Sequence, residues 1–271
     1  MLWEHYYKNM PLRLSLLVIL LNCFIDLSAQ NEQLIIKPPA GSGERFFVFE
    51  NPKGSVKVTG YDGDLIVVNA SPRFPDLEKV TTAGLHRIEQ NPVNIRAEVN
   101  GRNVLLLTSS DGKTVDFDIK MPSVFSMKLK SLDNGNIDVL NISGNIEVVN
   151  SNGNITLENI TGAAVLSSVY GAVTASFREV NPAAPMMFTS FEGSITLTLP
   201  AMINATIKMK SDKGEIYSEF DIRPLKRQPV MRQAGNTAVY SLEDWTTGLI
   251  NNGNGDLVLK TYSGNITLKK R

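Results

Sequence analysis

The chain has 271 residues, of which 42% are hydrophobic, and its 27 basic side chains balance 27 acidic ones. A chain without net charge lacks the attraction that draws basic proteins to nucleic acid or to anionic membranes, so neither is expected as a partner. Cys23 is the single cysteine, and His86 is the only histidine beyond the first 29 residues. An intramolecular disulfide and a zinc site of cysteine and histidine are therefore excluded.

Residues 1–29 are predicted to be a signal peptide. The apolar run Leu14–Ile25 is shorter than the roughly 20 residues that a membrane-spanning helix needs, but it suits the core of an export signal. Leu27–Ala29 supplies a cleavage site, so the mature chain is expected to begin near Gln30 and to have no transmembrane span. Cys23 raises the alternative of a lipoprotein, which the Asn before it disfavours. The expected location is the periplasm, the outer membrane surface or the extracellular space.

The next stretch predicts a linker followed by irregular β structure. Residues 30–44 are polar and contain proline and glycine, which indicates a flexible lead-in. Residues 45–121 are predicted to form an irregular N-terminal β region that includes the first coil of the fold. Within it, Asn94–Leu107 reads as a hairpin with an Asn-Gly turn. Residues 71–90 break the strand period and are expected to form a loop or cap with a short helix-like piece at Asp76–Thr82.

Glycines recur every nine residues in the middle of the chain. They are Gly135, Gly144, Gly153, Gly162 and Gly171. Each opens a phrase such as GNITLEN, in which aliphatic residues alternate with polar ones, and this period of two is typical of a half-buried strand. Ile155 and Leu157 are therefore predicted to be buried and Thr156 exposed. Because one short strand cannot bury its apolar face alone, the units must stack. The predicted fold is all-β, a single-stranded β-solenoid similar to a parallel β-helix over residues 122–271.

The corners of this solenoid are predicted from the residue three positions before each glycine. Those residues are Asn141, Asn150, Asn159 and Ser168. Their short polar side chains are expected to point inward and to hydrogen-bond the bending backbone. The glycine itself is expected because a tight corner needs a positive φ.

No catalytic, cofactor or metal site is predicted. His86 has no serine in a nucleophile context nearby and is expected to lie on the surface. Among the outward positions three residues after each glycine, only Asp138 and Glu147 are acidic, and consecutive strands should place them on opposite faces. Paired-carboxylate catalysis is not supported. The spacing of the aspartates in the glycine turns matches neither the EF-hand loop nor the GGxGxD calcium-binding nonapeptide.

The best candidate for a binding surface is an excursion from the repeat at residues 221–244 and the tryptophan that follows it. Loops on a rigid scaffold carry function more often than the scaffold does, and basic residues with tryptophan are enriched at binding hot spots. The predicted binding residues are Arg223, Lys226, Arg227, Arg232 and Trp245.

Several motifs in order resemble the bacterial family of exported putative adhesin domains, which are built of glycine-punctuated β-strand repeats. The motifs are VKVTGYDGD, IKMPSVFSMKL, the GNI phrases, ITLTLPAMINATIKMKSDKGEI and INNGNGDLVLKTYSGNITLKK, which together cover most of Phe46–Lys270. The resemblance implies an extracytoplasmic β-solenoid that is adhesin-like, with no catalytic residues to carry over. Residues 221–244 are the least covered.

The function expected is that of an exported cell-envelope or surface module, adhesin-like, which is not an enzyme and which binds a surface protein or a glycan. One alternative is a β-helix enzyme that acts on polysaccharide, with its site at the basic excursion. Acidic and basic side chains that converge on one cleft would favour it. A second alternative is a periplasmic sensor or assembly partner.

Overall fold

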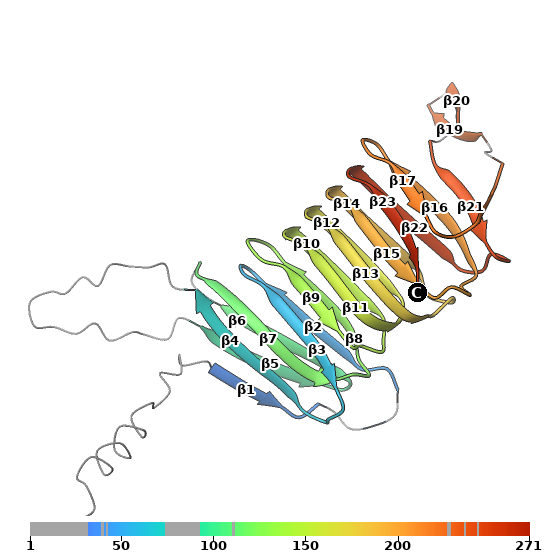
Figure 1. Cartoon of the computed structure of the whole chain (residues 1–271). Coiled ribbons are helices and arrows are strands. Elements are labelled where there is room, and N and C mark those ends of the chain that lie inside the picture. Colours follow the sequence, from blue (N-terminus) through green and yellow to red (C-terminus); the bar gives the residue numbers. More distant parts are fainter. Residues whose placement is uncertain are drawn as a thin grey trace, which may run out of the picture. The chain divides into compact units, whose positions relative to one another are not determined.

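The computed structural model describes residues 32–38, 41, 43–73, 93–109, 112–226, 229–235, 237–242 and 244–271. The predicted signal peptide, the helix-like piece and His86 lie outside these residues. The described chain is all-β, and most of its strands form two large, mainly parallel sheets (Figure 1). It contains no helix, and so none that could span a membrane, within those ranges.

The strands of each sheet are given in spatial order. Sheet A consists of β1 (Glu32–Ile36), β4 (Ile66–Arg73), β7 (Thr114–Pro122), β3 (Val56–Tyr61), β9 (Ile137–Leu140), β11 (Ile155–Gly162), β13 (Val173–Val180), β15 (Ile195–Leu199), β23 (Ile266–Lys270) and β17 (Ile216–Ser218). Sheet B consists of β18 (Ile222–Pro224), β21 (Thr246–Ile250), β16 (Ala205–Ser211), β22 (Asp256–Ser263), β14 (Met186–Glu192), β12 (Ala164–Tyr170), β10 (Ile146–Asn152), β8 (Ser126–Ser131), β2 (Phe46–Asn51), β6 (Asn103–Ser109) and β5 (Asn94–Asn100). A separate hairpin consists of β19 (Val230–Ala234) and β20 (Thr237–Ser241). Both large sheets are open, since each ends in two edge strands.

Through the middle of the chain, successive strands alternate between the two sheets. Ile137 of β9 lies opposite Ile155 of β11, and Ile155 lies opposite Val173 of β13, so parallel neighbours are offset by eighteen residues. The nine-residue phrase is therefore half of the spatial repeat. Consecutive phrases enter opposite sheets, and every second phrase returns to the same sheet. Because the apolar side chains on the facing sides meet between the sheets, they form one buried cluster.

The side-chain register follows the prediction for the aliphatic residues of β11. Ile155 and Leu157 are 0% exposed. Thr156 points outward but is half-buried, not exposed as predicted. Its neighbours in the sheet, Asp138 and Thr174, stand directly beside it in the same row and cover part of its surface.

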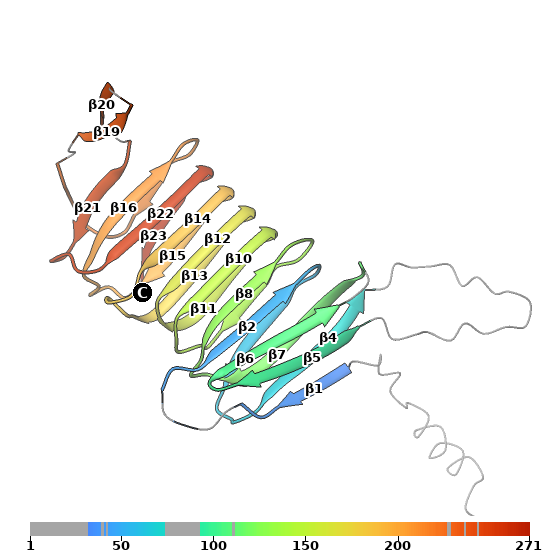
Figure 2. The same cartoon turned by 180° about the vertical axis from the view of Figure 1, so that it is seen from behind.

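The first and last repeat phrases do not lie at the ends of the stack. In sheet B, β2 lies between β6 and β8, and β22 lies between β14 and β16. In sheet A, β3 lies between β7 and β9, and β23 lies between β15 and β17 (Figures 1 and 2). The order of the strands in space therefore differs from their order in the chain. A parallel sheet accepts any segment whose apolar alternation is in register, and Leu257 of β22 fits between Met186 and Ile207.

Antiparallel strands cover both ends of the parallel stack. At one end β4 pairs with β7, β1 with β4 and β5 with β6; at the other, β21 pairs with β16 and β18. The hairpin predicted at Asn94–Leu107 is confirmed as β5 and β6. The prediction of a flexible lead-in is wrong for Glu32–Ile36, which forms strand β1. Its residues pair with β4, and Ile36 is buried in the core whereas Ile35 is exposed.

Buried polar side chains line one corner of the stack, as predicted for Asn150 and Ser168. Their side chains donate hydrogen bonds to the carbonyl oxygens of Gly135 (3.0 Å) and Gly153 (3.3 Å). The same contact recurs between spatial neighbours, from Ser131 to Gly54 (3.1 Å), Ser190 to Gly171 (2.9 Å), Thr261 to Gly193 (2.9 Å) and Ser211 to Gly264 (2.8 Å). The intercalated strands thus obey the same rule as their neighbours. We call this column of contacts the corner ladder.

The prediction is wrong for Asn141 and Asn159, which belong to the opposite corner. Both have left-handed backbones (φ 58° and 59°), and Asn141 is exposed. The Asn159 side chain donates a 2.6 Å hydrogen bond to Asn141 Oδ1, while the inward places are taken by Ile142 and Ile160. The two corners turn differently: at this one the Asn adopts the left-handed conformation, and the aliphatic residue after it takes the inward place.

Close approach of backbones, more than positive φ, accounts for the glycines of the corner ladder. Gly153 has φ 142°, but Gly135 and Gly171 are not in the left-handed region. A Cβ atom on Gly171 would lie 2.0 Å from the carbonyl oxygen of Gly153, and one on Gly153 would lie 2.1 Å from that of Gly135. Neighbouring turns therefore stack too closely for any side chain.

Replacement of Gly171 by Ala is expected to destabilise the fold by about 1–3 kcal/mol, because the new methyl group collides with backbone that cannot move aside. The matched control is Gly101→Asn in the β5–β6 turn. Gly101 has φ 58°, which Asn tolerates, and a Cβ there meets nothing within 4 Å. Urea unfolding monitored by circular dichroism measures both. Equal stability of Gly171→Ala and the unmodified chain would contradict the close-approach explanation.

Candidate binding groove

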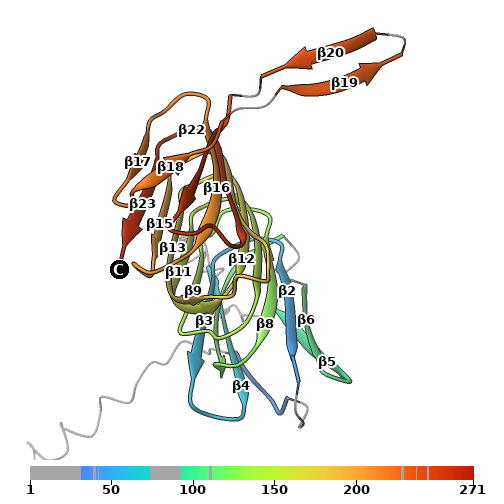
Figure 3. The same ribbon diagram turned by 90° about the vertical axis from the view of Figure 1, so that its right-hand side faces the viewer.

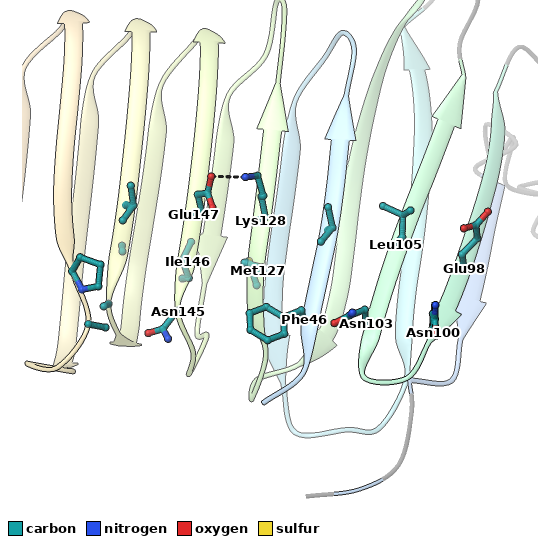
Figure 4. A pocket seen from close by; sticks show the side chains of 16 residues that line it. Phe46, Glu98, Asn100, Asn103, Leu105, Met127, Lys128, Asn145, Ile146 and Glu147 are labelled. Atoms are coloured by element: carbon teal, nitrogen blue, oxygen red, sulfur yellow. Dashed lines mark ion pairs between the residues drawn. The ribbon is translucent and has the colours of Figure 1, made fainter. Parts of the chain in front are cut away.

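A groove of about 660 Å³ lies on the outer face of sheet B. Strands β5, β6, β2, β8, β10 and β12 contribute its lining, together with Ala184 and Pro185 just before β14 (Figure 4). The lining is mostly apolar, which is typical of ligand sites on proteins. We refer to it as the sheet B groove.

The floor of the groove is one row of outward-facing side chains, with one residue from each strand. In this row Leu105 is opposite Val48, Val48 is opposite Lys128, Lys128 is opposite Glu147, and Glu147 is opposite Val165. Adjacent residues of each strand point into the core, so the alternation that builds the core also sets this outer row. The result is two apolar stretches separated by a charged pair.

The charged side chains of the groove are already paired within the chain. Lys128 Nζ lies 2.7 Å from Glu147 Oε1, as Figure 4 shows, and Arg96 lies 2.6 Å from Glu98 at the β5 end. Their partners lie on neighbouring strands or on the same strand, so the pairing needs no rearrangement. The groove therefore carries little uncompensated charge.

A second row, of amides around a phenylalanine, borders the floor. Asn145, Phe46, Asn103 and Asn100 follow one another along one end of the groove (Figure 4). Phe46 is 41% exposed although its neighbour Phe47 is fully buried. Asn145 is held by two contacts: its backbone N–H donates to Ser126 Oγ (2.9 Å), and its side-chain amide donates to a carboxylate oxygen of Glu44 (3.3 Å).

The residues predicted to bind from the excursion lie at the other end of sheet B. Arg223 is exposed on β18, Lys226 is exposed just after it, and Trp245 is half-buried before β21, with Lys208 Nζ 4.5 Å from its ring centre. Arg232 belongs to the β19–β20 hairpin, which extends away from the two sheets (Figure 3). Arg227 and the side chain of Arg232 lie outside the description. The strand of Arg223, β18, pairs with β21, which begins directly after Trp245. The binding role of the excursion stays a prediction.

Two basic side chains elsewhere have a raised pKa. Asp116 accepts hydrogen bonds from Arg73 at 2.5 and 2.6 Å and raises the pKa of that guanidinium. The phenol of Tyr262 raises the pKa of Lys213, whose Nζ lies 4.7 Å from the Tyr262 ring centre. Neither residue lines the sheet B groove, and both contacts stabilise the charged form of a base at the surface.

Other chemistry is sparse in the described part of the chain. Asp138 and Glu147 lie in different sheets, as the two-strand repeat predicts. In the ranges that the structure describes, no three side chains of histidine, cysteine, aspartate or glutamate are grouped so that they could hold a metal ion.

The sheet B groove could not be predicted from the sequence, because its parts are distant in the chain. Phe46, Asn103 and Asn145 meet only because β2 is inserted between β6 and β8, and nothing in the linear order announces that insertion. One local signal was present. In FFVF the buried positions are Phe47 and Phe49, so Phe46 is an aromatic residue at an outward position, where strands of this chain mostly carry polar residues.

Comparisons with known proteins give one structural likeness. No family model matches the chain, and no curated protein matches it. Among solved structures, the chain is similar to a putative cell adhesion protein from Clostridium sporogenes, with 12% sequence identity and a TM-score of 0.44. The match covers 89% of this chain and 100% of the other.

Proposed function

We propose that this chain is an exported, adhesin-like binding module of the cell envelope, that its two sheets form a β-solenoid, and that the sheet B groove is its binding site. The groove carries the proposal, because it is a preformed, largely apolar depression on a rigid sheet. Support for the solenoid comes from the eighteen-residue offset between parallel strands and from the corner ladder that joins neighbouring turns. Support for export comes from the Leu14–Ile25 segment and from the resemblance to exported adhesin domains.

One observation supports the alternative of a polysaccharide-active enzyme, and another opposes it. Glu98, Lys128 and Glu147 do line the same groove. However, Glu98 and Glu147 stand four strands apart in one row, which at a strand spacing of about 4.8 Å separates their backbones by about 19 Å. The two carboxylates of a glycosidase lie about 5–9.5 Å apart. The spacing therefore favours binding over hydrolysis.

The proposal predicts that native cells hold the protein outside the cytoplasm and that purified protein adheres to their isolated envelopes. Phe46→Ala should reduce this retention at least fivefold, because it removes the exposed ring beside the groove floor. Tyr217→Ala is the matched control, since Tyr217 is 53% exposed on β17 in the other sheet. Cell fractionation and a sedimentation assay provide both readouts.

Three outcomes would contradict the proposal. They are a cytoplasmic location, no retention by any envelope fraction, and equal retention of Phe46→Ala and the unmodified chain. Release of reducing sugar ends from envelope polysaccharide by the purified protein would replace the binding module with the enzyme alternative.

A further inference from the structure

We infer that the sheet B groove binds a neutral oligosaccharide, a glycan chain without carboxylate, sulfate or phosphate groups. The inference rests on the proposed function and names the class of its ligand.

The charge of the groove favours a neutral ligand. The three charged lining residues are Glu98, Lys128 and Glu147, and each has its partner within the chain. An acidic glycan would meet two carboxylates and only one lysine, already paired. A cationic ligand would have to compete with Arg96 or Lys128 for its carboxylate, so neither sign of charge gains a new partner.

The hydrogen-bonding groups that remain are side-chain amides. Among the described residues, none forms a hydrogen bond with the side-chain amide of Asn100 or Asn103. None donates to the side-chain Oδ1 of Asn145, while its NH₂ group donates to Glu44. An amide presents one acceptor and two donor hydrogens side by side. Sugar hydroxyls on adjacent carbons present the same mixture of donor and acceptor, so one amide can bind two of them.

The apolar surface lies where a sugar ring would need it. Phe46 stands between Asn145 and Asn103 in the row, and Val48 and Leu105 lie beside it on the floor (Figure 4). A pyranose ring has apolar C–H faces and a polar rim. A surface with an exposed aromatic ring and amides on both sides matches both features.

The place of the groove in the sheet disfavours an extended peptide. Apart from the edge strand β5, the groove lies on the face of strands whose backbone N–H and C=O groups already pair with neighbours on both sides. A peptide added there could not extend the sheet, and its own backbone groups would lose water without gaining backbone partners. A glycan has no such requirement. The row from Asn100 to Asn145 crosses four strand spacings, about 19 Å, which suits a chain of several sugar rings.

The test is titration calorimetry of the full mature chain with four tetrasaccharides. Cellotetraose, mannotetraose and N-acetylchitotetraose are neutral, and tetragalacturonate is the acidic comparison. We expect at least one neutral sugar to bind and tetragalacturonate to bind at least tenfold more weakly. Phe46→Ala and Asn103→Asp should each raise the Kd at least tenfold, because one removes the ring and the other removes the amide donor. Tyr217→Ala should leave the Kd unchanged.

The inference is overturned if none of the neutral sugars binds, if tetragalacturonate binds best, or if Phe46→Ala and Asn103→Asp both bind like the unmodified chain. Envelope retention separates this result from failure of the proposed function. If protease treatment of the envelopes abolishes retention and periodate oxidation of their sugars does not, the partner is a protein. The binding module then stands and the glycan inference falls. If the envelopes retain nothing, both fall.

Discussion

A chain that ends at Gly255, without β22 and β23, is expected to lose its cooperative unfolding transition. These strands fill the space between β14 and β16 in one sheet and between β15 and β17 in the other, so their loss detaches everything from Ala205 to Ile250. They also bury Leu257, Leu259, Ile266 and Leu268. At about 1.5–3 kcal/mol for each aliphatic side chain, the loss reaches about 6–12 kcal/mol. A typical domain has a total stability of about 5–15 kcal/mol.

Thermal melting by circular dichroism and limited proteolysis measure this effect. The matched control removes a segment of similar length, residues 229–242, which contains the β19–β20 hairpin and no strand of the two large sheets. That variant should keep its melting transition within a few degrees of the full chain. If truncation at Gly255 melted like the full chain, or if the hairpin deletion were equally damaging, the intercalated topology would be wrong.

The second large effect is expected for Ile155→Lys. Ile155 lies in the centre of the core with no exposed surface, so the substitution loses the burial of an aliphatic side chain and places an ammonium group among aliphatics with no carboxylate partner. We expect a loss of more than about 4 kcal/mol, enough to unfold the chain or leave it partly folded. Urea denaturation gives the value.

The matched control, Thr156→Lys, changes the neighbouring residue on the outer face. Its new ammonium group stands beside Asp138 in the next strand, so we expect a change within about 1 kcal/mol of zero. If Thr156→Lys were the more damaging of the two, the strand would face the other way, and every outward residue of β11 would exchange places with a core residue.

Local patterns in the sequence were sufficient for the strands and for one corner. The alternation around Ile155 and Leu157 fixed the buried face, and the position of Asn150 three residues before Gly153 predicted an inward polar side chain. These features depend on contacts that repeat along the chain, so their physical cause recurs in every phrase. The prediction for the corner at Asn141 was wrong because a nine-residue template treats both corners as equal. The signal that separates them is Ile142, an aliphatic residue directly after the asparagine.

Long-range order could not be predicted from the same patterns. Each GNI phrase is compatible with several neighbours, because the strand of any phrase presents the same apolar alternation to the next. The positions of β2 between β6 and β8 and of β22 between β14 and β16 depend on small differences in packing summed over whole strands. The sheet B groove follows from the first of these placements, so it was out of reach for the same reason. The excursion of Arg223 stands out in the sequence because it is local and breaks the pattern.

Methyl NMR of the Ile, Leu and Val side chains, recorded with and without the tightest-binding neutral tetrasaccharide, tests most directly whether the sheet B groove is the binding site. The prediction is that the methyl signals of Val48, Leu105 and Val165 on the groove floor shift with a single saturable dependence on sugar concentration. Leu249 lies opposite Arg223 on β21, and Leu225 follows β18 and hydrogen-bonds to Thr247 of β21. The methyl signals of these two leucines should not shift. Shifts at Leu225 and Leu249 with none at Val48 and Leu105 would contradict the account and would place binding at the excursion.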